Sequence, residues 1–187
     1  LIDILDHTIT PMGARLMRKW CVLPLKEKKP IQERLDTVEM FLKHNESMPE
    51  LAQILKPIGD LERLVSKVAV RRISPRELVQ LKRALGQIEP IKEIFSTKLG
   101  KSEVLTKYLD QLNDCKFLVD KITNELREDA PNLSNAGGMI CSGVDADLDE
   151  LHKIAFSGKD YLIDLQNRES ARAGIPSLKI AFNKVFG

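Results

Sequence analysis

Residues 147–173 read DLDELHKIAFSGKDYLIDLQNRESARA, and this stretch predicts one long helix. Acidic residues stand at its start and Arg168 and Arg172 at its end, which is the charge order that the helix dipole favours. Gly174 suits the left-handed residue after a last turn, and Pro176 prevents continuation. At 1.5 Å per residue, such a helix would be about 39 Å long.

The apolar residues of this helix repeat at about seven residues, as in a seam that packs against another helix. They are Leu148, Leu151, Ala155, Leu162 and Leu165. The repeat ends where Glu169 and Arg172 occupy the next two core positions. We therefore predict that one end of the helix is packed and that the other reaches outward.

The sequence before this helix has the periodicity and the start signals of several shorter helices. Ser74-Pro75-Arg76-Glu77 forms a capping box, and Pro90 predicts a break near residues 86–90. The predicted helices are 11–20, a second from Pro30, 51–56, a third from Asp60, one from Ser74, 103–113 and 115–127. The fold class is thus mainly α, with a multi-helix domain over residues 1–146 and the long helix over 147–174.

A change of period from 3.6 to 2 marks the end of the chain. Leu178, Ile180 and Phe182 fall on one face and Lys179, Ala181 and Asn183 on the other, which predicts a short β element over residues 175–187. A single strand is not stable alone, so the sequence predicts that its partners are absent. The start at Leu1, without Met, indicates a piece of a longer protein.

Composition excludes several classes of protein. The 29 Lys and Arg against 27 Asp and Glu leave a net charge of +2, so no strong overall field favours nucleic acid or membrane. Three cysteines without a Cys-x-x-Cys pair fit a reducing compartment, and we expect a cytoplasmic protein. No apolar run approaches the roughly 20 residues of a membrane helix, and we expect no membrane partner.

No catalytic, cofactor-binding or metal site is predicted from the motifs. Gly100-Lys101-Ser102 lacks the earlier glycine of a phosphate loop, because that position holds Phe95. The acidic run at 145–149 lacks the glycine and the final acid of a calcium loop. His7, His44 and His152 have no Cys or Asp at ligand spacing. The chain is therefore not expected to be an enzyme by itself.

Two basic clusters leave a contact with nucleic acid open. Residues 15–34 hold seven Lys or Arg and two Glu, which fits a solvated face or a contact with another domain. Lys179 and Lys184, with Asn183 between them, could touch a DNA backbone without reading its sequence. Ordinary exposed strand lysines explain the same residues equally simply.

Several segments, taken in order, resemble the core domain of the MutS family of DNA mismatch-repair proteins. The resemblance spans essentially the whole chain, although each segment alone is a weak signal. The segments are Leu5-Asp6-His7-Thr8, residues 10–16 with Trp20 and Pro24-Leu25, Arg34, residues 60–64, residues 74–78, Ser142-Gly143 with residues 148–151, and residues 183–187. Departures are small: Ala14 and the pair Ala181-Phe182 stand where the family often has a glycine and a Gly-Tyr pair.

The resemblance implies a bacterial core domain with a lever that links an ATPase to a DNA-holding clamp. Residues 147–174 would be the lever helix, packed through Leu148, Leu151, Leu162 and Leu165, and residues 175–187 would begin the clamp. The full-length parent would be a homodimer that binds mismatched double-stranded DNA, ATP and Mg²⁺ and a MutL-type protein. The parent's nucleotide loop and mismatch-reading motif are absent from this chain, so the chain itself would transmit and not catalyse.

Two other hypotheses stay open from the sequence. The same domain occurs in MutS paralogues that act in recombination, and this region discriminates them poorly. A free-standing helical interaction scaffold, without any link to nucleotide or DNA, is a third possibility, because a fold alone does not imply a function.

Overall fold

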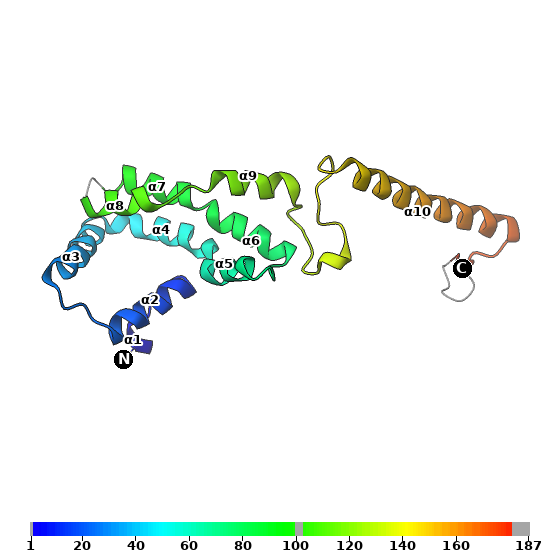
Figure 1. Ribbon diagram of the computed structural model, residues 1–187. Helices are drawn as coiled ribbons and strands as arrows, with labels where there is room; N and C mark the ends of the chain where they lie inside the picture. The colour runs from blue at the N-terminus through cyan, green and yellow to red at the C-terminus, as the bar shows by residue number, and fades with distance from the viewer. Residues whose placement is uncertain (1, 100–102, 181–187) are drawn as a thin grey trace. The chain divides into compact units, whose positions relative to one another are not determined.

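The computed structural model describes residues 2–99 and 103–180, and it is mainly helical (Figure 1). The helices are α1 (Ile2–Leu5), α2 (Pro11–Val22), α3 (Lys28–Lys43), α4 (Met48–Leu55), α5 (Leu61–Ala69), α6 (Pro75–Leu85), α7 (Ile88–Thr97), α8 (Glu103–Gln111), α9 (Lys116–Glu125) and α10 (Ala146–Ala173). Three 3₁₀ turns accompany them, η1 (Asn45–Ser47), η2 (Lys56–Ile58) and η3 (Ser134–Ala136). The chain divides into two units, Leu1–Cys141 and Ser142–Gly187.

The start signals of the sequence act as predicted. The Thr10 hydroxyl accepts from the Gly13 N–H at 3.1 Å and caps α2, which has Pro11 at its first position. Ser74 and Glu77 form the capping box of α6 in both directions, at 3.3 and 3.1 Å. The predicted break near Pro90 is the boundary between α6 and α7, because a proline is tolerated only in the first turn of a helix.

Two apolar clusters hold the first unit together. The first joins α5, α6 and the start of α9: Leu64, Leu81 and Leu85 are buried, with Leu61, Ile73, Leu78, Ile88, Cys115 and Val119 packed against them. The second joins α3, α4, α7 and α8 around Ile94, Leu99 and Leu105. In it, the rings of Phe41 and Phe95 meet edge to face, with centroids 6.0 Å apart. Helices α1 to α3 contribute no fully buried residue.

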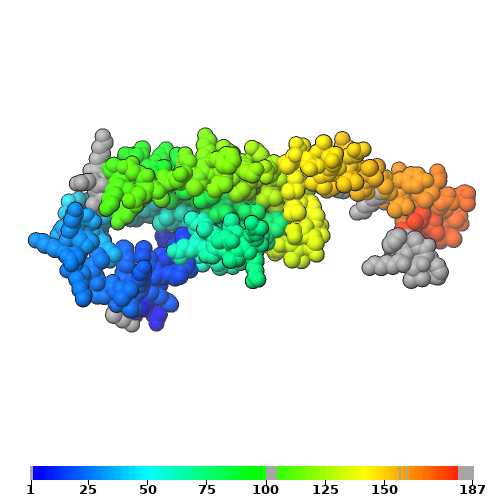
Figure 2. Space-filling view, viewed as in Figure 1, coloured from blue at the N-terminus to red at the C-terminus, as the bar shows by residue number. Residues whose placement is uncertain are grey.

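A loop closes on itself between α9 and the end of the first unit. Its two ends are paired by an antiparallel bridge between Leu126 and Ile140. Ala130 in this loop is buried, and the Arg76 N–H of α6 donates to the Pro131 carbonyl at 3.2 Å. In Figure 2 this yellow loop lies against the green and teal surface of α5 and α6. The β-like run at 139–141 is therefore one side of a bridge, not a strand.

The predicted β element near the end of the chain is not seen. Residues 178–180 are irregular, and the remaining part, residues 181–187, lies outside the described residues. Alternation of period 2 predicts a strand only where a partner strand supplies hydrogen bonds, and none is present among residues 2–99 and 103–180. The Ile180 N–H is instead paired with the side-chain oxygen of Gln166 in α10, at 2.9 Å.

Candidate functional site

The start of α10 is organised by two carboxylates. Asp145 is the N-cap, and its side chain accepts from the Leu148 N–H at 2.8 Å. Asp149, one turn further on, accepts from the Ser142 hydroxyl at 3.2 Å and from the Gly143 N–H at 2.7 Å. Asp145 and Asp149 belong to the acidic run that resembles a calcium loop. Helix capping and the helix dipole therefore account for acidic residues at these positions.

The apolar face of α10 is broader than the sequence analysis proposed. Leu148 and Leu165 are half-buried, whereas Leu151 and Leu162 are 62% and 48% exposed. Ile154 and Tyr161, which the seven-residue pattern did not include, are also exposed and lie one position before Ala155 and Leu162. The residues described in this structure do not cover this face, so the packing of the predicted seam stays a prediction. The missed signal was the pair Ile154 and Tyr161, which stand seven residues apart along one side of the seam.

The chain that follows α10 turns back along this helix. Gly174 adopts the left-handed conformation, with φ +68°, and the Ser170 hydroxyl donates to the Ile175 carbonyl at 2.7 Å. Lys179 lies just beyond this turn and is exposed. The other two predicted DNA-contact residues, Asn183 and Lys184, lie outside the described residues. Of the three predicted DNA-contact residues, the structure therefore describes only Lys179, which follows the C-terminal end of α10.

Two arginines of the basic stretch 15–34, Arg15 and Arg34, have partners inside the fold. Arg15 of α2 donates to Asp60 at 2.7 and 3.0 Å and to Glu62 at 2.5 and 2.9 Å. The guanidinium of Arg34 lies 3.7 Å from the centre of the Trp20 ring, a cation–π contact between α3 and α2. Hydrogen bonds from Arg15 hold the pKa of the Asp60 carboxyl below its ordinary value. These two arginines thus anchor α2 within its own unit.

Glu77 connects the start of α6 to α5. Its carboxylate accepts from the Lys67 ammonium at 2.5 Å and from the Ser74 N–H at 3.1 Å, and Arg63 lies 3.8 Å away. The Lys67 hydrogen bond, together with the backbone bond, lowers the pKa of Glu77. Hydrogen bonds from Lys82 and Arg83 of α6 likewise lower the pKa of Glu128 in the closed loop.

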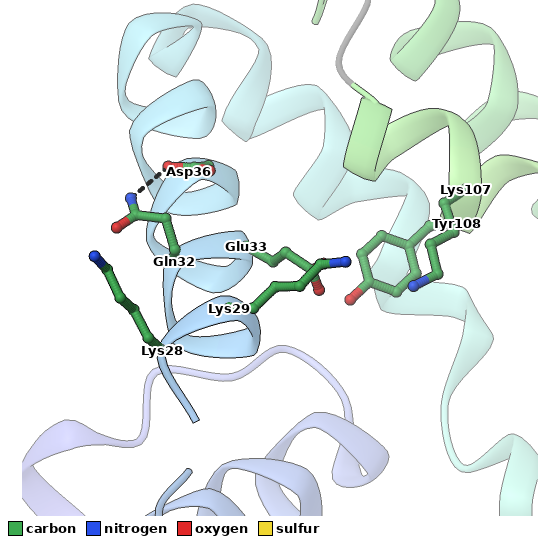
Figure 3. Close-up of a pocket in the computed structure, with 7 residues that line it drawn as sticks. All are labelled: Lys28, Lys29, Gln32, Glu33, Asp36, Lys107 and Tyr108. Atoms are coloured by element: carbon green, nitrogen blue, oxygen red, sulfur yellow. Dashed lines mark hydrogen bonds between the residues drawn. The ribbon is translucent and has the colours of Figure 1, made fainter. Parts of the chain in front are cut away.

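A hollow of about 910 Å³ lies beside α3 and α8 (Figure 3). Lys29 and Glu33 of α3 point toward Tyr108 of α8, whereas Gln32 and Asp36 are bonded to each other at 2.7 Å on another side of α3. The remaining lining residues are Lys28 and Lys107. Charges of both signs and mostly exposed side chains give this hollow no preference for one class of ligand.

Neither a metal centre nor a membrane span is found in the part of the chain that the structure describes. No group of three His, Cys, Asp or Glu side chains could hold a metal ion there. Within the same residues, no helix is both long and apolar enough to cross a membrane. Gly100-Lys101-Ser102, which lacks the first glycine of a phosphate loop, lies outside the described residues.

Comparison with known proteins shows the family to which this chain belongs. The family model described as MutS domain III matches residues 1–178. The chain belongs to the MutS family. It is 58% identical over its full length to the DNA mismatch repair protein MutS of Cytophaga hutchinsonii, 54% to that of Phocaeicola vulgatus and 46% to that of Christiangramia forsetii. It covers 22%, 21% and 21% of these proteins, so it spans about a fifth of the relatives' length.

Membership of the MutS family gives the motif residues a structural meaning. The residues that carried the resemblance meet each other in pairs across the fold: Arg15 with Asp60 and Glu62, Trp20 with Arg34, Ser74 with Glu77, and Ser142 and Gly143 with Asp149. Each pair lies at a helix start or joins two helices. In this chain, these motif residues therefore join and cap the helices.

Proposed function

We propose that this chain is the core and lever region of a DNA mismatch-repair protein and that it couples distant sites without catalysing a reaction. The observation that carries the proposal is the match of residues 1–178 to MutS domain III, together with relatives that bear the name DNA mismatch repair protein MutS. These names favour the repair branch over the recombination alternative. Membership of the family also counts against an unrelated helical scaffold.

The long helix has the mechanical properties that a lever needs. Its 28 residues span about 42 Å at 1.5 Å per residue, and both of its ends are capped. A helix fixed at its base converts a small shift there into a larger displacement at its tip. The exposed apolar face with Leu151 and Leu162 would pack against another part of the parent, so that a shift is transmitted and not absorbed.

The proposed contact with DNA depends on Lys179. Its exposed ammonium, beyond the last turn of α10, would contact phosphate, together with Asn183 and Lys184. Such contacts position a protein on DNA without reading its sequence. The parent protein, acting as a homodimer and with a MutL-type partner, would supply recognition of the mismatch.

ATP and Mg²⁺ would be bound by the parent outside this chain. The described residues offer no metal-binding cluster, and the Gly-Lys-Ser run lacks the glycine that a phosphate loop requires. The residues present therefore do not fit a nucleotide site. This chain would contribute by connecting distant sites of the parent, without catalysing a reaction.

Fluorescence anisotropy against matched and mismatched duplexes, at two salt concentrations, tests this division of labour. We expect weak, salt-sensitive binding that does not distinguish the duplexes, and Lys179→Ala should reduce the salt slope by about one. Lys153→Ala, an exposed lysine in the body of α10, is the matched control and should leave the slope unchanged. A clear preference for the mismatched duplex would place recognition in this chain and overturn the proposal.

A further inference from the structure

The backbone that joins the two units is fixed to the first unit up to Cys141. The Cys141 N–H donates to the Glu125 carbonyl at 2.9 Å, and the Arg127 N–H donates to the Met139 carbonyl at 2.9 Å. With the Leu126–Ile140 bridge, these bonds tie the outgoing strand of the closed loop to the end of α9. Residue 141 is also the last residue of the first unit. The first unit therefore ends at a firmly held residue.

On the other side, the backbone is fixed to the second unit almost at once. The half-buried Asp149 carboxylate reaches back from the first turn of α10 and accepts from the Ser142 hydroxyl and the Gly143 N–H, at 3.2 and 2.7 Å. Gly143 has φ +87°, a conformation that L side chains rarely adopt, and this turns the chain so that its N–H points at the carboxylate. Ser142, Gly143 and Val144 are otherwise exposed.

We propose that Asp149 is a linker clamp that shortens the flexible connection between the two units to a hinge of two residues, Cys141 and Ser142. Between the bonded N–H of Cys141 and the bonded N–H of Gly143 lie only four backbone dihedrals. Without the Asp149 bonds, the free segment extends through Val144 to the N-cap Asp145 and has eight. The clamp thus turns a tether into a hinge, because each additional free residue widens the set of accessible orientations.

The clamp rests on the proposed function only for its consequence, which is how movement reaches α10. A two-residue hinge limits the directions in which α10 can move relative to the first unit, whereas a longer tether would absorb movement before it reached the helix. The clamp itself depends on no ligand, nucleotide or DNA. Its test can therefore fail while the proposed coupling function stands, and the reverse also holds.

The experiment compares Asp149→Ala with Asp147→Ala in this chain. Asp147 lies two residues earlier in the same first turn, carries the same charge and has no hydrogen bond or ion pair in the structure. Spin labels on unnatural amino acids at Asn124 of α9 and Lys153 of α10, both exposed, leave the three cysteines in place. Pulsed electron double resonance then gives the distribution of distances between the units.

We expect Asp149→Ala to widen the distribution by about 1.4-fold or more, since the number of free residues doubles and spread grows with its square root. Asp147→Ala should leave the width unchanged. Equal widths in all three proteins, or equal widening by both variants, would overturn the clamp. Circular dichroism of each variant checks that α10 remains helical.

A second measurement on the unmodified chain does not depend on any variant. The Gly143 amide is bonded to a carboxylate, whereas the neighbouring Val144 amide has no partner in the structure, and both residues are exposed. We expect the Gly143 amide to exchange its hydrogen about tenfold more slowly than the Val144 amide after correction for sequence effects. Equal exchange rates would show that the clamp is not closed in solution and would overturn the proposal.

Discussion

The guanidinium of Arg15 in α2 binds both carboxylate oxygens of Asp60, the N-cap of α5, at 2.7 and 3.0 Å. Asp60 at the same time accepts from the Arg63 N–H at 3.2 Å, so one carboxylate begins a helix and holds another helix against it. Because α2 buries no residue of its own in this chain, polar contacts of this kind carry its attachment to the first unit.

Replacing Arg15 by Lys should loosen α2 without unfolding the rest of the unit. Lysine keeps the positive charge but cannot present the planar pair of donors that fits a carboxylate. We expect the amides of α2 to exchange several-fold faster in Arg15→Lys, measured by hydrogen exchange with mass spectrometry. Arg18→Lys, on the same helix and without a bonded partner in the structure, is the control. Equal exchange of α2 in both variants would contradict this role.

Acid should destabilise the first unit partly through Glu77. Because Lys67 and the Ser74 N–H hold the folded pKa of Glu77 below its ordinary 4.5, the carboxylate stabilises the fold above about pH 4.5. That stabilisation is lost as the pH falls through the folded pKa, since the unfolded chain then binds the proton more tightly. Thermal unfolding from pH 6 to pH 3 should therefore depend less on pH in Glu77→Gln.

The control for Glu77 is Glu89→Gln, an exposed residue in the first turn of α7 without a bonded partner in the structure. It should keep the pH dependence of the unmodified chain. A Glu77→Gln protein whose unfolding midpoint falls as steeply with acid as the original would show that Glu77 does not contribute.

Truncating Leu64 should cost far more stability than truncating its neighbour Val65. Leu64 is 4% exposed within the cluster of α5, α6 and α9, whereas Val65 is 52% exposed. Leu64→Ala leaves a cavity, so we expect a loss of about 2–5 kcal/mol in the free energy of unfolding, measured in urea. Val65→Ala should change it by about 0.5 kcal/mol or less. Similar losses at the two positions would mean that the cluster is not the core of the unit.

Placing a charge on the seam of α10 should uncouple the two ends of the full-length protein. Leu162→Asp would bury an unpaired carboxylate wherever the seam is packed, which is strongly unfavourable. We expect ATP-driven release from mismatched DNA to weaken by about 5- to 150-fold, the usual range of allosteric coupling. Ile163→Asp, equally exposed here at 50% but off the seam, is the control. Unchanged release in Leu162→Asp would remove the lever hypothesis.

The sequence alone predicted most of the helices, although not α1 and not every boundary, because the signals that start and stop a helix are local. Thr10, Ser74 and Asp145 each cap the helix that follows them, and Pro90 and Gly174 mark a break and an end. Hydrogen bonds of this kind join residues within one turn, so their spacing is visible in the chain. The long helix over residues 146–173 is the clearest case.

What only the tertiary structure decided was which distant residues meet. The pairs Arg15–Asp60, Trp20–Arg34 and Arg76–Pro131 join residues from 14 to 55 positions apart in the chain, and no local periodicity encodes them. Residues 178–180 show the converse: a local alternation is present, but these described residues are irregular, and a strand forms only when a partner supplies its hydrogen bonds. Local bonds can thus be predicted from the order of residues, whereas contacts between helices depend on how the apolar faces pack together.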